Sequence, residues 1–241
     1  MKMQNRKFLN TTLEACFIED RDSIIDKLDR YQEMVLEWNK KINLTSITQE
    51  DDFVLKHFVD SLLCCHFKGM KEAKLIADVG TGAGFPGIPL AITYPDKEFH
   101  LIDSLKKRLG FLQEVVDELK LKNIVLIHGR AEDIGKDEKY REKYDLVLSR
   151  AVARLNVLSE YCLPLVKLNG TFAALKSNDA EEEAHESRKA MNLLGGELEH
   201  LQEDLSDGKL LNHMIIYTKK VKNTPKKYPR KAGEPTKTPI I

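Results

Sequence analysis

A carboxylate followed by a glycine-rich turn is the first feature of this chain that could bind a small molecule. Residues 74–91 read KLIADVGTGAGFPGIPLA, in which an apolar run ends at Asp78. Three glycines follow within six residues: Gly80, Gly82 and Gly84. A strand that turns sharply into a helix needs residues without a Cβ, because the backbone takes positive φ values there and approaches the ligand closely. This spacing is typical of a nucleotide-binding βαβ unit.

The carboxylates indicate which nucleotide is bound. Gly82, Gly84 and Gly87 also satisfy the dinucleotide spacing, so the glycines alone leave a nicotinamide cofactor open. Asp78, however, stands where dinucleotide folds usually carry an apolar residue, and its charge suits an amino acid ammonium. S-adenosyl-L-methionine has such an ammonium, and its ribose hydroxyls suit Asp103, which ends the next apolar run. We therefore expect this cofactor; a nicotinamide cofactor and a glycine-rich turn that binds nothing are the alternatives.

The elements that position these residues alternate between strands and helices. The apolar runs predict strands at 74–79, 98–103, 123–128, 144–149 and 170–176. A parallel, doubly wound sheet follows, with the glycine turn entering a helix near Phe85. Residues 196–220 predict two more strands, with Asp207 and Gly208 reversing the chain into an antiparallel last strand.

Ligands of such sheets bind beyond the carboxyl ends of the strands. That rule adds Ser104 to the candidate cofactor residues, since it directly follows Asp103. Ser104 could instead cap the helix that starts there, and both roles are compatible.

The chain divides into three parts by pattern. Apolar residues at steps of three and four predict helices over 20–42 and 51–67, so that residues 1–73 form an N-terminal helical extension. Residues 74–220 form the cofactor-binding domain, and residues 221–241 form a basic, proline-rich tail.

Composition favours an intracellular enzyme. With 241 residues, 42% of them hydrophobic, the chain can bury a full core, and its start lacks the apolar segment of a signal peptide. No run is long enough to cross a membrane. The four cysteines lack C-x-x-C spacing, so we expect buried thiols and neither a metal site nor disulfides. A cytoplasmic monomer is expected.

The tail carries a concentrated positive charge in a chain whose net charge is zero. Residues 219–241 contain eight Lys or Arg against a single acid, Glu234, and four prolines that should keep the segment extended and free of helix. A polyanion partner is indicated, and an aromatic ring among the charges favours RNA. A disordered, solubilising tail is the alternative. The expected RNA-binding residues include two beyond the tail: Arg154, Lys176, Lys226, Lys227, Tyr228, Arg230 and Lys231.

The methyl acceptor is constrained by which motifs are missing. Methylation of exocyclic amines usually uses an Asp/Asn-Pro-Pro-aromatic motif after the fourth strand, but that strand here ends LSRAVAR (148–154). Methylation of pyrimidine carbons needs a cysteine nucleophile in a loop, and Cys162 lies in a predicted helix. A purine nitrogen such as guanine N7 has a free lone pair and needs only positioning.

Several segments together resemble one family over nearly the whole chain. They are WNKKINLT (38–45), HFVDSL (57–62), DVGTGAGFPGIPLAI (78–92), LIDSLKKRLGFL (101–112), GRAED (129–133), DLVLSRAVA (145–153) and KYPRKAGEPTKTPI (227–240). This pattern is similar to the bacterial 16S rRNA guanine-N7 methyltransferases, historically called glucose-inhibited division protein B.

The resemblance implies a Rossmann-like class I methyltransferase fold and a defined reaction. S-adenosyl-L-methionine would methylate N7 of a guanine in the 530 loop of 16S rRNA, on free rRNA or the small ribosomal subunit, and leave S-adenosyl-L-homocysteine. Gly80 and Phe85 would contact the cofactor, Ala131 and Glu132 would lie beside its adenosine half, and Arg150 would lie at the cofactor and acceptor end.

Arg150 needs separate treatment, because arginine often grips guanine through O6 and N7 and here N7 must stay open. We expect Arg150 to orient the methionine carboxylate, a phosphate or O6; an ion pair with a nearby acid is the alternative. His57 and Asp60 fit a packing pair as well as they fit part of a functional site, so no catalytic role is assigned to them. Two other functions stay open: a methyltransferase for proteins or small molecules, and a non-enzymatic RNA-binding assembly factor.

Overall fold

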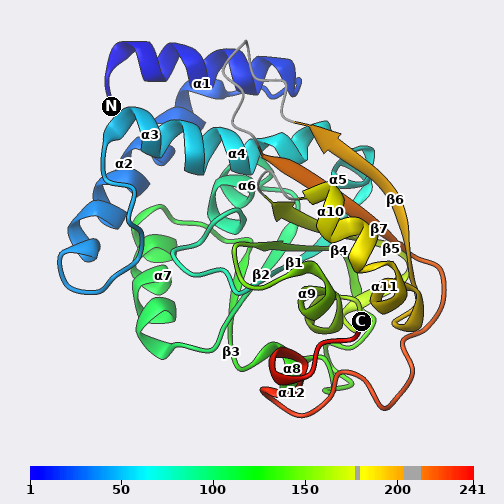
Figure 1. Cartoon of the computed structure of the whole chain (residues 1–241). Helices are drawn as coiled ribbons and strands as arrows, with labels where there is room; N and C mark the ends of the chain where they lie inside the picture. The colour runs from blue at the N-terminus through cyan, green and yellow to red at the C-terminus, as the bar shows by residue number, and fades with distance from the viewer. Residues whose placement is uncertain (177–179, 204–212) are drawn as a thin grey trace.

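A single seven-stranded sheet in the order β3-β2-β1-β4-β5-β7-β6 forms the centre of the protein (Figure 1). The computed structural model describes residues 1–176, 180–203 and 213–241. All five strands expected between residues 74 and 176 are present, and only β5 begins more than one residue early. The strands are β1 (Leu75–Val79), β2 (Glu98–Asp103), β3 (Ile124–His128), β4 (Tyr144–Arg150), β5 (Val166–Lys176), β6 (Gly196–Glu203) and β7 (Met214–Lys220).

The directions of the strands follow from their connections. Strands β1 to β5 pair in parallel, because a helical segment returns the chain between successive strands. Strand β7 runs antiparallel to both of its neighbours, β5 and β6. The predicted antiparallel last strand is therefore confirmed, whereas the turn predicted at Asp207 and Gly208 lies outside the described residues.

Helices from the first half of the chain cover one face of the sheet (Figure 1). Their buried side chains form one apolar cluster with sheet residues such as Ile76, Phe99 and Leu148, so residues 1–73 share a core with the sheet. These helices are α1 (Met3–Ala15), α2 (Arg21–Asn39), α3 (Glu50–Phe53), α4 (Asp60–Leu62), α5 (Lys68–Glu72), α6 (Gly87–Thr93) and α7 (Lys106–Glu118).

The second face of the sheet packs against the C-terminal helices. Its apolar cluster contains Val79, Ile102 and Phe172 from the strands, together with Tyr228 from the tail. The helices on this side are α8 (Ala131–Ile134), α9 (Leu155–Cys162), α10 (Ala180–Glu186) and α11 (Arg188–Leu193).

The N-terminal helices differ in detail from the sequence pattern. Helix α2 ends at Asn39, whose Oδ1 accepts hydrogen bonds from the amides of Leu44 and Thr45 and so turns the chain. The helix predicted over 51–67 is present, but it changes character along its length: a π-helical turn, η1 (Val54–Val59), and a 3-10 turn, η2 (Leu63–His66), flank α4. Such π turns occur frequently at functional sites, and this one carries His57.

The basic tail is folded onto α9, which corrects the expectation of an extended segment. Arg141 donates from Nη1 to the carbonyl of Tyr228 and from Nη2 to that of Thr224, both at 2.8 Å. A short helix, α12 (Glu234–Lys237), follows despite the prolines. The tail is ordered because buried groups of distant elements supply its partners, which composition does not reveal.

Two further expectations concern helices and cysteines. Among the residues that the structure describes, no helix combines the length and apolar character needed to cross a bilayer. All four cysteines are free and buried, as expected, and Cys162 is the last residue of α9.

Candidate active site

The carboxyl ends of β1 to β4 enclose a cavity of about 310 Å³ beside the glycine turn. A volume of this size is within the range of small-molecule sites. The cavity is lined by Val79, Gly80, Ile102, Asp103, Ser104, Arg108, Gly129, Arg130, Ala131, Glu132, Ala151, Val152 and Tyr161. We call it the first cavity. Five of the ten predicted cofactor residues line it: Gly80, Asp103, Ser104, Ala131 and Glu132.

The three glycines of the turn have positive φ values but different surroundings. A Cβ on Gly80, at φ +73°, would come within 2.4 Å of Val152 Cγ2 in the cavity wall. Gly82, at φ +61°, has open space around a Cβ and donates its amide to Asp103 Oδ2 at 3.0 Å. At Gly84 a Cβ would collide with Tyr31, so this glycine serves packing against α2. Only Gly80 is part of the cavity lining.

Asp78 lies beneath the turn and is fully buried. Its Oδ2 accepts hydrogen bonds from Thr81 Oγ1 at 2.7 Å and from the Gly87 amide at 3.0 Å. Burial raises the pKa of Asp78 to about 6, although both hydrogen bonds oppose that shift. Its Oδ1 has no partner among the described residues. A buried carboxylate oxygen left unpaired is costly. Asp78 lines neither the first cavity nor the cavity that adjoins it, so its contact with the cofactor ammonium stays a prediction.

Asp103 ties the turn to the second strand. Its Oδ1 accepts the Leu105 amide at 2.8 Å, and its Oδ2 accepts the Gly82 amide. A carboxylate offers about four acceptor positions, so Asp103 keeps capacity for ligand hydroxyls. Ser104 is exposed, and helix α7 has Leu105 as its N-cap without a side-chain capping bond. The capping role considered for Ser104 is therefore not seen.

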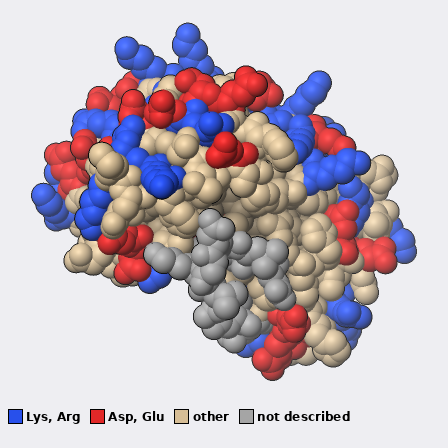
Figure 2. Space-filling model, turned by 90° about the horizontal axis from the view of Figure 1, so that it is seen from above, with Lys and Arg blue, Asp and Glu red and all other residues tan. Residues whose placement is uncertain are grey.

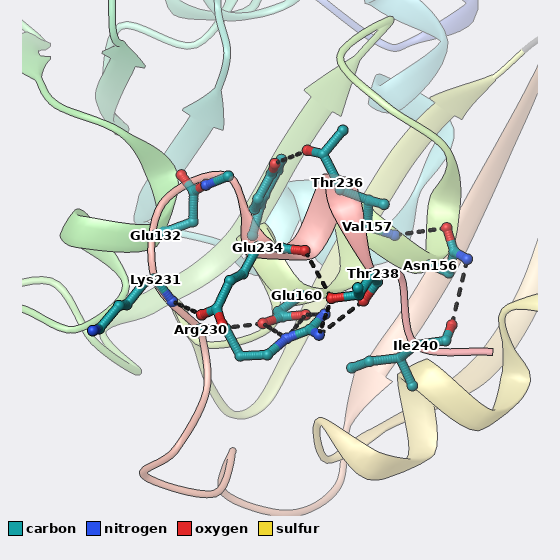
Figure 3. A network of polar contacts seen from close by, with 12 residues as sticks. Glu132, Asn156, Val157, Glu160, Arg230, Lys231, Glu234, Thr236, Thr238 and Ile240 are labelled. Carbon is teal, nitrogen blue, oxygen red and sulfur yellow. Dashed lines mark hydrogen bonds and ion pairs between the residues drawn. The ribbon is translucent and has the colours of Figure 1, made fainter.

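Glu132 connects the first cavity to the tail, as Figure 3 shows. It is nearly buried in α8, and its Oε1 accepts the Gly233 amide at 2.8 Å. Tyr161, also in the lining, shares a hydrogen bond of 2.9 Å with Thr236. The tail thus supports the adenosine side of the predicted cofactor site from outside.

Arg230 fastens the tail at this place (Figure 3). Its Nη2 donates to Glu160 Oε2 at 2.6 Å and its Nε donates to Oε1 at 2.9 Å, while Nη1 donates to the Thr238 carbonyl at 2.8 Å. The backbone amide of Arg230 also donates to Glu160, which is only 1% exposed. A bidentate pair with a buried carboxylate fixes position as well as charge.

A second cavity of about 350 Å³ lies on the other side of Ala151. Ala151 follows β4 with φ +54° and lines both cavities, so the two adjoin there. The second lining comes from the N-terminal extension, the ends of β4 and β5, and α10: Ile47, Lys56, His57, Asp60, Arg150, Ala151, Leu175, Lys176, Ala180, Glu183 and His213.

Arg150 lines this second cavity and is fixed to the N-terminal extension. Its Nη1 donates to Asp60 Oδ2 at 2.7 Å and to the Lys56 carbonyl at 2.9 Å, and its Nη2 lies 3.1 Å from His57 Nδ1. Asp60 also pairs with His213 at 2.8 Å. The ion pair considered as the alternative for Arg150 is therefore present. Arg150 lines the cavity that adjoins the first one at Ala151, and its contact with the cofactor stays a prediction.

The charges in this network define the protonation of His57. Burial, together with the charge of Arg150, lowers the pKa of His57 to about 3, so the ring is neutral at pH 7. Burial opposes ionisation of Asp60, but the hydrogen bond from His213 and the charge of Arg150 hold the pKa of that carboxyl below its usual range. Because Nδ1 accepts from Arg150, the Nε2 proton faces Thr45 Oγ1 at 2.9 Å.

Phe85 packs in the core and is not part of the lining of the first cavity, so its contact with the cofactor stays a prediction. Its ring stacks on His57 with centroids 4.4 Å apart and lies 5.3 Å from Tyr31. The Arg150 guanidinium lies 5.1 Å from the same ring. Phe85 therefore positions the Arg150 network, because its side chain is 5% exposed and surrounded by protein.

The predicted RNA-binding residues fall into two groups. Tyr228 is 8% exposed within the core, so it offers no free stacking surface, and Arg230 is committed to Glu160. Arg154 and Lys176 each form an ion pair, with Glu186 and Glu183. The other three predicted residues are exposed lysines of the tail: Lys226, Lys227 and Lys231.

No large basic patch dominates the face shown in Figure 2, where Lys and Arg lie among Asp and Glu. Sequence reasoning missed Tyr161 and Glu183, which line the two cavities. Val152, which lines the first cavity, follows a strand end that the sheet rule nominates. Tyr161 and Glu183 reach the cavities from helices, and no local pattern distinguishes them from other residues of those helices.

Comparisons with known proteins identify the family of the chain. Residues 24–211 match the family described as rRNA small subunit methyltransferase G (GidB). The chain is 49% identical over 239 residues to the ribosomal RNA small subunit methyltransferase G of Alkaliphilus oremlandii, spanning 99% of this chain and 100% of that relative. It is 50% identical over 211 residues to the protein of the same name from Clostridium tetani, spanning 88% of each.

A solved structure supports the fold alone. A SAM-dependent methyltransferase from Aquifex aeolicus aligns with a TM-score of 0.54 and 19% identity, covering 77% of this chain and 98% of that chain. The Rossmann-like methyltransferase fold expected from the sequence is confirmed. On the family match and the two relatives, this chain belongs to the rRNA small subunit methyltransferase G family.

Proposed function

We propose that this protein transfers the methyl group of S-adenosyl-L-methionine to N7 of a guanine in the 530 loop of 16S rRNA. Membership of the family makes the chain an rRNA methyltransferase. The finer statement, the base and its position, rests on the segments that resemble guanine-N7 methyltransferases. The observation that carries the proposal is the pair of adjoining cavities at Ala151, since methyl transfer needs a donor site beside an acceptor site.

The residues of the first cavity fit the cofactor. Asp103 has free acceptor positions for ribose hydroxyls, and Gly80 leaves room for close backbone approach. Ala131 and Glu132 border the part that would receive the adenine. The unpaired Oδ1 of Asp78 fits a ligand that brings an ammonium group, which a nicotinamide dinucleotide lacks at that end.

Methyl transfer to guanine N7 requires no general base from the side chains. The cofactor supplies an activated methyl group on a sulfonium, and guanine N7 carries a lone pair, so no base has to remove a proton before the attack. The protein contributes alignment of the two groups and limited access of water. We assign no catalytic base. His57 Nδ1 is already occupied by Arg150, and burial raises the pKa of Cys162 well above its usual value, which disfavours a thiolate nucleophile.

The test is transfer of a labelled methyl group to three kinds of acceptor. Small ribosomal subunits and deproteinised 16S rRNA from unmethylated cells are compared with the protein fraction of the same cells. We expect label in RNA, released by nuclease digestion as 7-methylguanosine. Label in protein or small molecules would favour a different methyltransferase, and absence of cofactor binding would favour a non-enzymatic assembly factor.

The same experiment compares free rRNA with the assembled subunit as substrate. We propose that the enzyme acts as a monomer in the cytoplasm, where ribosomal subunits are assembled. Sedimentation of the purified protein alone and with small subunits checks the first point.

A further inference from the structure

We propose that the second cavity binds the target guanine and that Lys176 and Glu183 read its Watson–Crick edge. This inference deepens the proposed function and rests on it. It assigns a specificity role to Glu183, which the sequence analysis did not single out, and to Lys176, which was predicted only as an RNA-binding residue.

The second cavity has the position that an acceptor pocket needs. It adjoins the first cavity at Ala151, and its walls include the carboxyl ends of β4 and β5, at Arg150 and Lys176. Enzymes that modify a base inside structured nucleic acid take the base out of its stack into such a pocket. The volume of about 350 Å³ lies within the range of small-ligand sites.

Apolar side chains provide surfaces for the faces of a planar base. Ile47 comes from the loop after α2, Leu175 from the end of β5 and Ala180 from the start of α10. These side chains stack on any base, so they give affinity without selectivity. Selectivity must come from the polar groups in the same lining.

Lys176 and Glu183 form a fixed pair of one donor and one acceptor. Lys176 Nζ lies 2.6 Å from Glu183 Oε2 and donates to the Ala153 carbonyl at 2.8 Å. The Leu155 amide donates to the same Oε2 at 3.0 Å. Both side chains are mostly buried, at 12% and 17% exposure, so the backbone holds their orientation.

Lys176 and Glu183 each keep one hydrogen-bonding position that is open to a ligand. An ammonium has three protons, and two of those on Lys176 are used. Glu183 Oε1 has no hydrogen bond among residues 1–176, 180–203 and 213–241. The cavity therefore presents one ammonium donor beside one carboxylate acceptor.

Guanine carries the complementary pattern on its Watson–Crick edge. Its O6 accepts, and the neighbouring N1–H and N2–H₂ donate, so O6 would face Lys176 while the two donors face Glu183 Oε1. Adenine presents a donor at N6 and an acceptor at N1, so its pattern is reversed. In the same orientation its N6 donor would face the Lys176 ammonium and its N1 acceptor would face the Glu183 carboxylate. The pair therefore selects guanine against adenine.

This orientation leaves N7 free to react. N7 lies on the Hoogsteen edge, away from N1 and N2, so gripping the Watson–Crick edge does not block it. Both protons of Arg150 Nη1 are used by Asp60 and Lys56, and Nη2 donates to His57, so the guanidinium is held against the N-terminal extension. The Hoogsteen edge carries N7 and must face the methyl donor, and Lys176 and Glu183 leave this edge uncontacted.

The test replaces the target guanine with inosine, which keeps O6, N1 and N7 but lacks the N2 amino group. A synthetic segment carrying either base is ligated into 16S rRNA, and kcat/KM is measured with labelled S-adenosyl-L-methionine. For the wild-type enzyme we expect inosine to be methylated about 10- to 100-fold less efficiently, since one hydrogen bond to a charged acceptor is lost.

Variants of Glu183 separate reading of the base from support of the fold. In E183Q and E183A the rate on guanine should fall below that of the wild-type enzyme on inosine, because the contact with N1–H is weakened as well, and the ratio of the two substrates should approach one. Affinity for S-adenosyl-L-homocysteine should stay unchanged, which shows that the variants fold. E182A, an exposed glutamate of the same helix, is the matched control and should keep the wild-type ratio.

Two results would overturn the inference while the proposed function stands. One is a wild-type enzyme that methylates guanine and inosine equally well. The other is a Glu183 variant that loses the same factor on both substrates, as a purely structural role predicts. A wild-type enzyme that does not methylate the guanine substrate would instead overturn the proposed function and the inference with it.

Discussion

At the scale of single residues, the first cavity depends on contacts that leave no space for a side chain. Gly80 faces Val152 across the cavity wall, and its own conformation lies in the left-handed region. Val152 is 41% exposed, so it could be displaced, but only toward the space that the cofactor needs. The glycine is required by the packing of two loops as well as by its φ value.

We predict that G80A weakens the binding of S-adenosyl-L-methionine by at least about tenfold, whereas G82A weakens it much less. Both substitutions carry the same cost of a left-handed alanine, about 1 kcal/mol. Only the Cβ at Gly80 pushes Val152 into the cavity. Isothermal titration of the two variants measures the difference. Equal affinities would mean that the contact with Val152 does not shape the site.

A second prediction concerns how the stability of the fold changes at acidic pH. The pKa of His57 is about 3 in the folded protein and about 6.5 in the unfolded chain, so between these values the unfolded state binds one more proton. Stability therefore falls as the pH drops below 6.5, and this group accounts for a loss of about 2 kcal/mol between pH 7 and pH 5.

The H57Q variant should lack that part of the pH dependence. Asp78 acts in the opposite direction, because its raised pKa of about 6 makes the folded state bind a proton more readily. That contribution is common to both proteins and cancels in the comparison. Denaturant unfolding at pH 7 and pH 5 gives the two slopes. Identical slopes would show that His57 is protonated in the folded protein.

At the scale of elements, the tail is a support of the cofactor site. It reaches Glu132 of α8 through Gly233 and Tyr161 of α9 through Thr236, and both residues line the first cavity (Figure 3). Removing the whole tail would uncover Tyr228 and the core as well as remove basic charge. Point variants separate these effects.

We predict that R230A destabilises the protein by about 2–4 kcal/mol, because it leaves the buried carboxylate of Glu160 without its partner. Affinity for the cofactor should fall by about three- to tenfold as the wall at Glu132 loosens. K231A removes the same charge one residue further on, from an exposed side chain, and should change neither quantity. Unfolding curves and titrations of both variants decide this. Wild-type affinity in R230A would mean that the tail does not support the site.

The elements of the sheet were predictable because their signals are local. Apolar runs that end at Asp78 and Asp103 mark strand ends, and the periodic helix between 21 and 39 follows from spacing alone. The position of the tail was not predictable. Its partners, Arg141 and Glu160, are more than 60 residues away, and a basic proline-rich composition contains no information about them.

At the scale of the whole molecule, charge is distributed unevenly but not in one patch. The net charge is zero, and in the tail Arg230 is neutralised by an ion pair with Glu160. The exposed lysines of the tail are Lys222, Lys226, Lys227, Lys231 and Lys237. Three of them were predicted to contact RNA: Lys226, Lys227 and Lys231.

We predict that replacing these three lysines by alanine lowers the salt dependence of RNA binding. Each phosphate contact contributes about 0.7–0.9 to the slope of log K against log salt, so the slope should fall by about 2. Cofactor affinity should not change. A charge-matched triple variant at exposed positions elsewhere is the control: Lys7, Lys68 and Lys122. An equal fall in the control would show a general charge effect and no binding surface in the tail.

The central claim is that the first cavity holds the methyl donor and the second the acceptor. The most direct measurement is a crystal structure of the protein with S-adenosyl-L-homocysteine. We predict that the ribose hydroxyls contact Asp103, the adenine lies beside Ala131 and the sulfur faces Ala151, with the second cavity left free for a base. Ligand bound against Arg150 and Lys176 in the second cavity would contradict the account.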